Sequence, residues 1–347
     1  MRFSASAALG GILLSTAALC GGPIEVRPGD AAAYEGFVEV KQSVGEDASN
    51  TGKFLATLAC RVSESAPGKL QVYAVRYLKP TEEGPEPLVS FDDGALAVKD
   101  AGFKLDWRVE IPPELEENSA ALEALYPLVV LPEISAPESG GEVKADGELA
   151  VLGSLIVKAP IVASLRRDGE SVTFSRKLAP GATPDFKFRD EASTLVSWSE
   201  TFRFASSKGL PTRIERTLAF EGKIADTKSK FELTLTLDRK KQSDGSGEDG
   251  ARLDATEKDL RSLGVDFAAL KSPEEISKRV AAALEKLKGT LWDSARDALS
   301  QRLVAYKASG LGKTAPDFTL ESLDGKQVAF RDATKGKVVL LSFWGVG

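Results

Sequence analysis

Alternation of inward and outward side chains constrains the fold of this chain more than any other feature of its sequence. In the run from 54 to 62 the members of one face are Phe54, Ala56, Leu58, Cys60 and Val62. A period of two is typical of a β-strand with one face turned toward a core. Similar runs follow at 70–78, 149–165, 172–178, 193–205, 213–220 and 231–237. We therefore predict that residues 34 to about 238 form a large antiparallel sheet, a curved sandwich or an open barrel.

Glycines that follow charged residues mark the expected turns of this sheet. They occur at Asp93-Gly94, Asp146-Gly147, Asp168-Gly169, Lys208-Gly209 and Glu221-Gly222. The stretch 112–126 interrupts the pattern, because two prolines and several glutamates precede a run of Ala and Leu. It predicts a short helix, which either covers one face of the sheet or lies on the surface.

Beyond a loop expected at 240–250, the apolar period becomes helical. Ser272 precedes Pro273 and stands three residues before Glu275, a typical helix start. A second helix start is expected at Thr290, and a shorter helix at about 255–263. We interpret these residues as a small helical connector.

Composition excludes several kinds of site. The 347 residues carry a formal net charge of −6 and no basic stripe, which argues against a nucleic-acid partner. Histidine is absent, so His-ligated metals and Ser-His-Asp triads are excluded. Grouped carboxylates occur at Asp92-Asp93 and among Glu114, Glu116 and Glu117, as in hydrolases and calcium sites, but turns and helix starts favour acids for local reasons. The sequence assigns no catalytic residue, no cofactor or cofactor-binding residue, and no metal ligand.

The amino-terminal residues predict export. Residues 1–22 carry Arg2 and then a short run rich in Ala, Ser and Leu, which is typical of a signal peptide. A lipoprotein anchored through Cys20 is the less favoured alternative, since Leu19 stands where such signals have a small residue. We expect a periplasmic or cell-envelope location with no membrane span after signal removal. Cys60 is then the sole thiol of the exported chain, and its place among apolar positions predicts a small buried side chain.

Three motifs near the carboxyl end occur in a fixed order. They are APDFTL at 315–320, LDGK at 323–326 and KGKVVLLSFW at 335–344. The Asp-Gly pair predicts a hairpin, and the apolar run predicts a strand buried on both faces. Together the residues from Ala315 to Gly347 resemble the opening of a TlpA/ResA-like thioredoxin-fold domain of the redoxin (AhpC/TSA) superfamily. Trp344 favours the TlpA-like members over the peroxiredoxins.

The resemblance implies chemistry that this chain does not contain. In TlpA-like proteins a Cys-x-x-Cys motif follows the Phe-Trp pair, so its first cysteine is expected immediately after Gly347. The chain is therefore interpreted as a fragment of an exported thiol-disulfide oxidoreductase, whose partner would be a protein disulfide or dithiol. Two alternatives stay open: a non-catalytic binding or structural module of the cell envelope, and a peroxiredoxin-like antioxidant parent.

The predicted fold class is a multidomain protein with a mainly antiparallel β domain, a short α-helical connector and an incomplete α/β thioredoxin-like domain. The boundaries are a signal peptide at 1–22, a β-rich domain of unknown role at 23–245, the connector at 246–310 and the truncated thioredoxin-like start at 311–347. The strand expected at 338–344 would lack the neighbours that bury it, so we expect this tail to be disordered, adhesive or docked on another edge.

Overall fold

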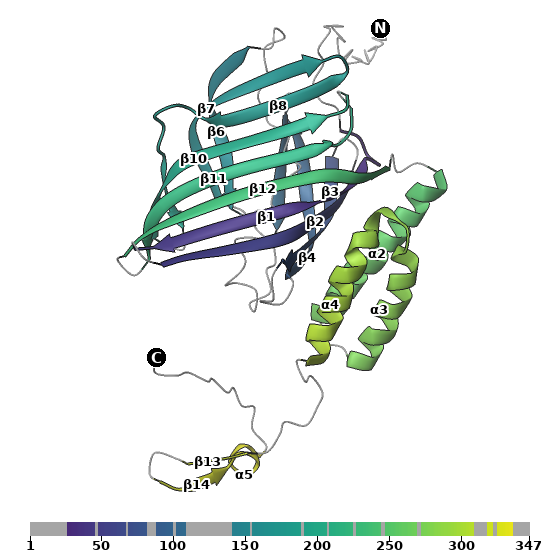
Figure 1. Ribbon diagram of the computed structural model, residues 1–347. Coiled ribbons are helices and arrows are strands. Elements are labelled where there is room, and N and C mark those ends of the chain that lie inside the picture. The colour runs from purple at the N-terminus through teal and green to yellow at the C-terminus, as the bar shows by residue number, and fades with distance from the viewer. Residues whose placement is uncertain are drawn as a thin grey trace, which may run out of the picture.

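A computed structural model describes residues 26–45, 48–66, 69–81, 88–99, 102–108, 141–152, 155–188, 191–206, 208–224, 227–243, 247–268, 272–308, 318–321 and 325–335. Its main feature is one twelve-stranded sheet in which every pairing is antiparallel (Figure 1). The first five strands are β1 (Ala31–Val44), β2 (Ala48–Ala66), β3 (Lys69–Pro80), β4 (Leu88–Lys99) and β5 (Gly102–Arg108). The remaining seven are β6 (Glu142–Leu152), β7 (Leu155–Asp168), β8 (Ser171–Leu178), β9 (Asp185–Phe188), β10 (Glu191–Phe204), β11 (Arg213–Ile224) and β12 (Thr227–Ser243).

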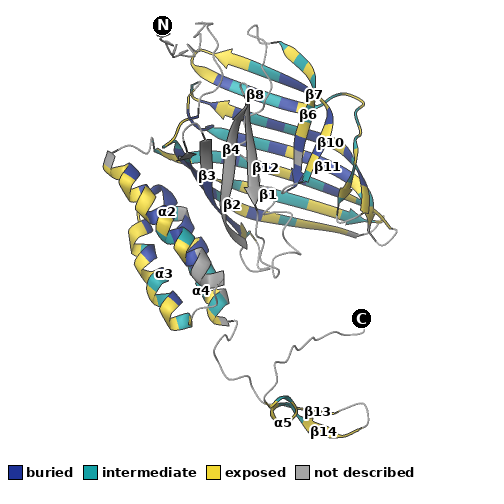
Figure 2. Ribbon diagram, turned by 180° about the vertical axis from the view of Figure 1, so that it is seen from behind, coloured by how far each residue is buried: buried dark blue, intermediate teal, exposed yellow. Residues whose placement is uncertain are grey.

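The sheet consists of two meanders joined in the middle. Its order is β5-β4-β3-β2-β1-β12-β11-β10-β8-β7-β6, with β9 paired to β10 off this path. The first and last long strands therefore lie side by side, in a register that pairs Val38 with Leu235. The sheet curls, so that β3 and β4 face β10 and β11 across its interior (Figures 1 and 2).

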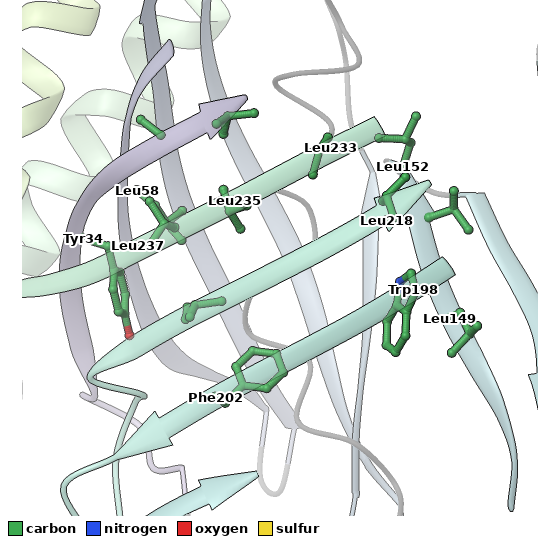
Figure 3. Packing of buried hydrophobic residues seen from close by; sticks show 14 of the residues in the cluster. Tyr34, Leu58, Leu149, Leu152, Trp198, Phe202, Leu218, Leu233, Leu235 and Leu237 are labelled. Atoms are coloured by element: carbon green, nitrogen blue, oxygen red, sulfur yellow. The ribbon is translucent and has the colours of Figure 1, made fainter. Parts of the chain in front are cut away.

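The concave face of this sheet carries the larger hydrophobic core. Buried side chains from both meanders form one cluster, which includes Leu58 on β2, Leu149 on β6, Trp198 on β10 and Leu235 on β12. Figure 3 shows these labelled side chains gathered on one side of the sheet. The alternation in the sequence produces this face, because every second residue of each strand points the same way.

Helices cover part of the opposite face. They are α2 (Gly247–Ala268), α3 (Pro273–Leu287), the short 3-10 helix η2 (Leu291–Ser294) and α4 (Ala295–Ala308). Their apolar stripes share a second core with the outward residues of β1, β2 and β3. Tyr73 of β3 meets Trp292 of η2 edge to face, with ring centroids 5.5 Å apart. Arg61 of β2 forms ion pairs with Asp254 and with Glu257 of α2, the latter at 3.3 Å.

The helix starts predicted at Ser272 and Thr290 are confirmed, whereas the shorter helix expected at about 255–263 is the longer α2, which begins at Gly247. The Ser272 hydroxyl accepts a hydrogen bond from the Glu275 amide, with Pro273 in the first turn. Thr290 caps η2 by accepting from the Trp292 amide, after Gly289 at a φ of 73°. The loop expected at 240–250 is largely wrong, since β12 continues to Ser243 by pairing with β1.

The predicted fold class is wrong. The described residues form mainly one antiparallel sheet, and α2, α3 and α4 share a core with it instead of forming only a connector. The described carboxyl-terminal residues form no α/β layer. They form the hairpin of β13 (Thr319–Glu321) and β14 (Gln327–Ala329), followed by α5 (Phe330–Thr334), with Phe318 stacked on Phe330. The packing of α2, α3 and α4 on the sheet was not predicted for a physical reason. An apolar stripe on a helix shows that one face of the helix is buried, but not which surface buries it.

Two of the expected turns are present and three are not. Gly169 and Gly209 lie between strands with φ values of 60° and 81°. The other three glycines lie inside strands. At Gly147 an added Cβ would lie 2.5 Å from the Ile161 side chain, so this glycine permits close approach of β7 and does not mark a turn. The signal peptide expected at 1–22, the helix expected at 112–126 and the strand expected at 338–344 lie outside the described residues.

Candidate binding face of the sheet

Three charged residues form a row across the concave face. The register of β10 places Glu200 directly opposite Arg176 of β8 on one side and Arg216 of β11 on the other. All three belong to the inward set of their strands, because they alternate with outward residues. A bulge between Leu195 and Ser197 in β10 helps to set this register.

The carboxylate of Glu200 is shared between the two guanidinium groups. Arg176 donates to Oε2 from Nε at 2.9 Å, and its Nη2 lies 2.7 Å from the same oxygen. Arg216 donates from Nη2 to Oε1. Arg176 also donates from Nη1 to the Glu148 carbonyl at 3.4 Å, and its guanidinium lies 4.9 Å from the centre of the Trp198 ring. The row therefore connects β8, β10 and β11 and touches β6.

The surroundings of this row are apolar in every direction along the sheet. In the cross-strand direction the row continues to Ala163 on β7 and to Leu235 on β12. Along the three strands the buried neighbours on the same face are Phe174, Trp198, Phe202, Ile214 and Leu218. Glu200 and Arg216 are each 1% exposed and Arg176 is 6% exposed. Figure 3 shows Trp198, Phe202 and Leu218 on this face.

The electrostatics of the row keep Glu200 ionised. Burial by itself raises the pKa of this carboxyl, but the charges of Arg176 and Arg216 and their hydrogen bonds outweigh burial, so the pKa lies below its ordinary value of 4.5. Two cations and one anion give the row a formal charge of +1. Desolvating such a cluster is expensive, and well-packed apolar side chains often serve stability as well or better. The row is therefore a candidate for a functional feature. The purely structural alternative is that the row fixes the register of β8, β10 and β11.

A further arginine lies on the inward face of the other meander. Arg76 of β3 lies on the same face of its strand as Val72, Ala74 and Leu78 of the inner core, and it is 1% exposed. Arg61, by contrast, belongs to the helix-covered face. The inner face thus combines an extensive apolar surface with buried guanidinium groups.

Among the described residues, none forms a redox site with Cys60. The thiol is fully buried in the inner core, and burial raises its pKa to about 12. A thiolate is the nucleophilic form of cysteine, so this thiol is unreactive in the folded protein. The prediction of a small buried side chain is confirmed.

The grouped carboxylates considered from the sequence do not form a site among the described residues. Asp92 and Asp93 lie within β4, not in a turn, whereas Glu114, Glu116 and Glu117 fall outside the described residues. Trp198 lies in the inner core and Trp292 in the core beneath the helices. In the part of the chain that the structure describes, no three His, Cys, Asp or Glu side chains are arranged to hold a metal ion.

The charged row was missed from the sequence although it has a signal there. Arg176, Glu200 and Arg216 each occupy a position where the period-two pattern calls for an apolar residue, between Phe174 and Leu178, Trp198 and Phe202, and Ile214 and Leu218 respectively. Inward charges in three strands suggest mutual pairing. The partners can be identified only once the strand order is known. β9 lies between β8 and β10 in the sequence, so the sequence does not show that β8 and β10 are neighbours in the sheet.

Comparisons with known proteins add little to this geometry. No family model and no curated protein sequence matches the chain. A solved S-type phycobiliprotein lyase from Guillardia theta aligns over 60% of this chain and 88% of its own at 9% identity, with a TM-score of 0.28. A Bacteroides fragilis protein assigned provisionally to the outer membrane aligns over 60% and 97% at 6% identity, with a TM-score of 0.11. Both likenesses are too distant to carry a fold or a function to this chain. None of the helices among the described residues has the length and apolar character needed to cross a membrane.

Proposed function

We propose that this protein is a non-catalytic binding module whose curved sheet takes up an apolar ligand against its concave face. The observation that supports the proposal is the single inner core, to which strands of both meanders contribute and to which the described helices contribute nothing. The sheet curls around this face (Figures 1 and 2). An eight-stranded barrel has an interior just wide enough for side chains, and sheets of more strands can enclose a ligand.

The chemistry of the described residues favours binding over catalysis. The described thiol is inert, and Arg176, Glu200 and Arg216 on the inner face pair with one another in a fixed arrangement. A concave apolar face with a few polar groups is the usual form of a small-molecule site. The expected export of the chain is compatible with a carrier or sensor of apolar molecules in the cell envelope.

Saturable binding of a fluorescent apolar probe tests this function. Protein stripped of bound lipid should bind N-phenylnaphthylamine to saturation, and hexadecanol should displace the probe far better than hexanol, because longer chains bury more apolar surface. Leu235→Asn on the inner face should weaken binding, while Leu55→Asn on the exposed outer face should not. Binding that does not saturate, or equal displacement by both alcohols, would reject the proposal even if Leu235→Asn does not fold.

A second candidate function is thiol-disulfide exchange by a chain that continues beyond Gly347. It is favoured by the hairpin of β13 and β14, whose turn contains Gly325 at a φ of 78° within the LDGK motif. The test is to extend the reading frame and assay reduction of insulin. Loss of activity on replacing the first added cysteine by serine would support it, and an inactive extended product would oppose it.

A further inference from the structure

The outward face of β1 and β2, which lie side by side in the sheet (Figure 1), carries an apolar surface beyond the helices. At one end of these strands the helices pack on the outward residues Ala31, Ala33 and Ala59. Further along the same face, Phe37 of β1 lies directly opposite Leu55 of β2, and these two side chains, the outer pair, are 48% and 39% exposed. We infer that the outer pair is the centre of an interface between two copies of this chain, an inference that does not depend on the proposed binding function.

The first argument is the apolar character of the outer pair. Single exposed apolar side chains are common, whereas adjacent ones mark contact surfaces, and aromatic residues are enriched at interfaces. Among the described residues of the twelve-stranded sheet, no other two large exposed apolar side chains lie directly opposite each other. The Lys53 ammonium group lies 5.3 Å from the centre of the Phe37 ring, yet about half of Phe37 stays exposed. A second copy packed on the outer pair would remove this apolar surface from water.

The second argument is the distribution of charge around the outer pair, which makes this surface complementary to itself. Glu35 and Glu39 occupy outward positions of β1 on one side, and Lys53 of β2 and Lys79 of β3 occupy outward positions on the other. Lys41 forms an ion pair with Glu39 at 3.0 Å and neutralises part of the acidic side. Glu35 and Lys79 form no ion pair within the described part of the chain. An acidic side and a basic side about one apolar centre fit a second copy of the same surface.

One symmetry operation produces this fit. A twofold axis parallel to the strands, between β1 and β2, turns β1 of each copy toward β2 of the other. Phe37 of one copy then meets Leu55 of the other, and Glu39 meets Lys53, because each of these pairs is directly opposite within the sheet. Sheets that pack face to face in this way keep their strands within about 30° of each other. Since each copy contributes only two large apolar side chains, we expect a weak dimer with a dissociation constant roughly in the micromolar range.

Sedimentation velocity at a series of protein concentrations tests the interface. Wild-type protein should change from monomer to dimer as its concentration rises. Phe37→Ser should raise the dissociation constant of the dimer by about tenfold or more, because it removes the aromatic side chain at the centre. Ile156→Ser is the matched control, since Ile156 lies on the outward face of β7 and is 47% exposed, and it should leave the dissociation constant unchanged.

Charge reversal in separate copies tests the geometry of the dimer. Lys53→Glu and Glu39→Lys each place like charges opposite each other across the interface, so each variant alone should dimerise less than wild type. A mixture of the two variants should form a mixed dimer, because one copy then carries the acids and the other the bases. Circular dichroism checks that these surface variants stay folded. Wild type that remains monomeric, a dimer that Phe37→Ser does not weaken, or a mixture that associates no better than either variant alone would overturn the inference.

Discussion

Glu200 is the residue on which the inner face depends most, because it is the only carboxylate in the row and both of its oxygens are engaged by arginines. Its lowered pKa has a definite consequence for stability. A carboxyl whose pKa is depressed by folding stabilises the protein above its ordinary pKa of 4.5, and this stabilisation is lost as the pH falls through the folded pKa.

This argument predicts the acid response of Glu200→Gln. At pH 7 the variant should be less stable than wild type by about 3 kcal/mol, since it leaves two buried guanidinium groups without their anion. The difference should shrink as the pH falls below about 4, because wild-type Glu200 then takes up a proton too. Urea unfolding at a series of pH values measures both free energies. A difference that stays constant down to the acid limit of folding would contradict this account of the row.

At the scale of elements, the unexpected feature is the attachment of the helices to the sheet. Alternation and capping identified strands and helix starts from the sequence, because both depend on neighbours a few residues away. The partner of the helical stripe was not predictable in this way. Tyr73 and Ala59 occupy outward strand positions, and only the folded sheet shows that helices cover them.

Trp292 should be the key contact of this attachment. It is fully buried and packs against Tyr73, so Trp292→Ala should lower the free energy of unfolding by about 3 to 5 kcal/mol. Val304→Ala on α4 is the control, since Val304 is 60% exposed and should change stability by less than about 0.5 kcal/mol. Hydrogen exchange of α3 should accelerate in Trp292→Ala. Unchanged stability and exchange would mean that the helices do not depend on the sheet.

At the scale of the whole molecule, the sequence predicted a β-rich chain but not the pairing of its first and last long strands. The pairing of β1 with β12 joins residues about 200 positions apart, and no local pattern encodes such a contact. Within the second meander, the pairing of β8, β10 and β11 brings Arg176, Glu200 and Arg216 together among apolar residues. The resemblance at the carboxyl end concerns residues 315–347 alone, and it implies nothing about the sheet that forms most of the described structure.

The central claim is that an apolar ligand binds on the concave face, and quenching of Trp198 fluorescence tests it most directly. Bromine atoms quench indole fluorescence on contact, so a long-chain alcohol brominated at mid-chain reports which tryptophan it touches. We predict saturable quenching in wild type and in Trp292→Phe, and loss of most of that quenching in Trp198→Phe, because Trp198 lies on the inner face and Trp292 beneath the helices. Quenching that persists in Trp198→Phe, or that disappears in Trp292→Phe, would contradict the account.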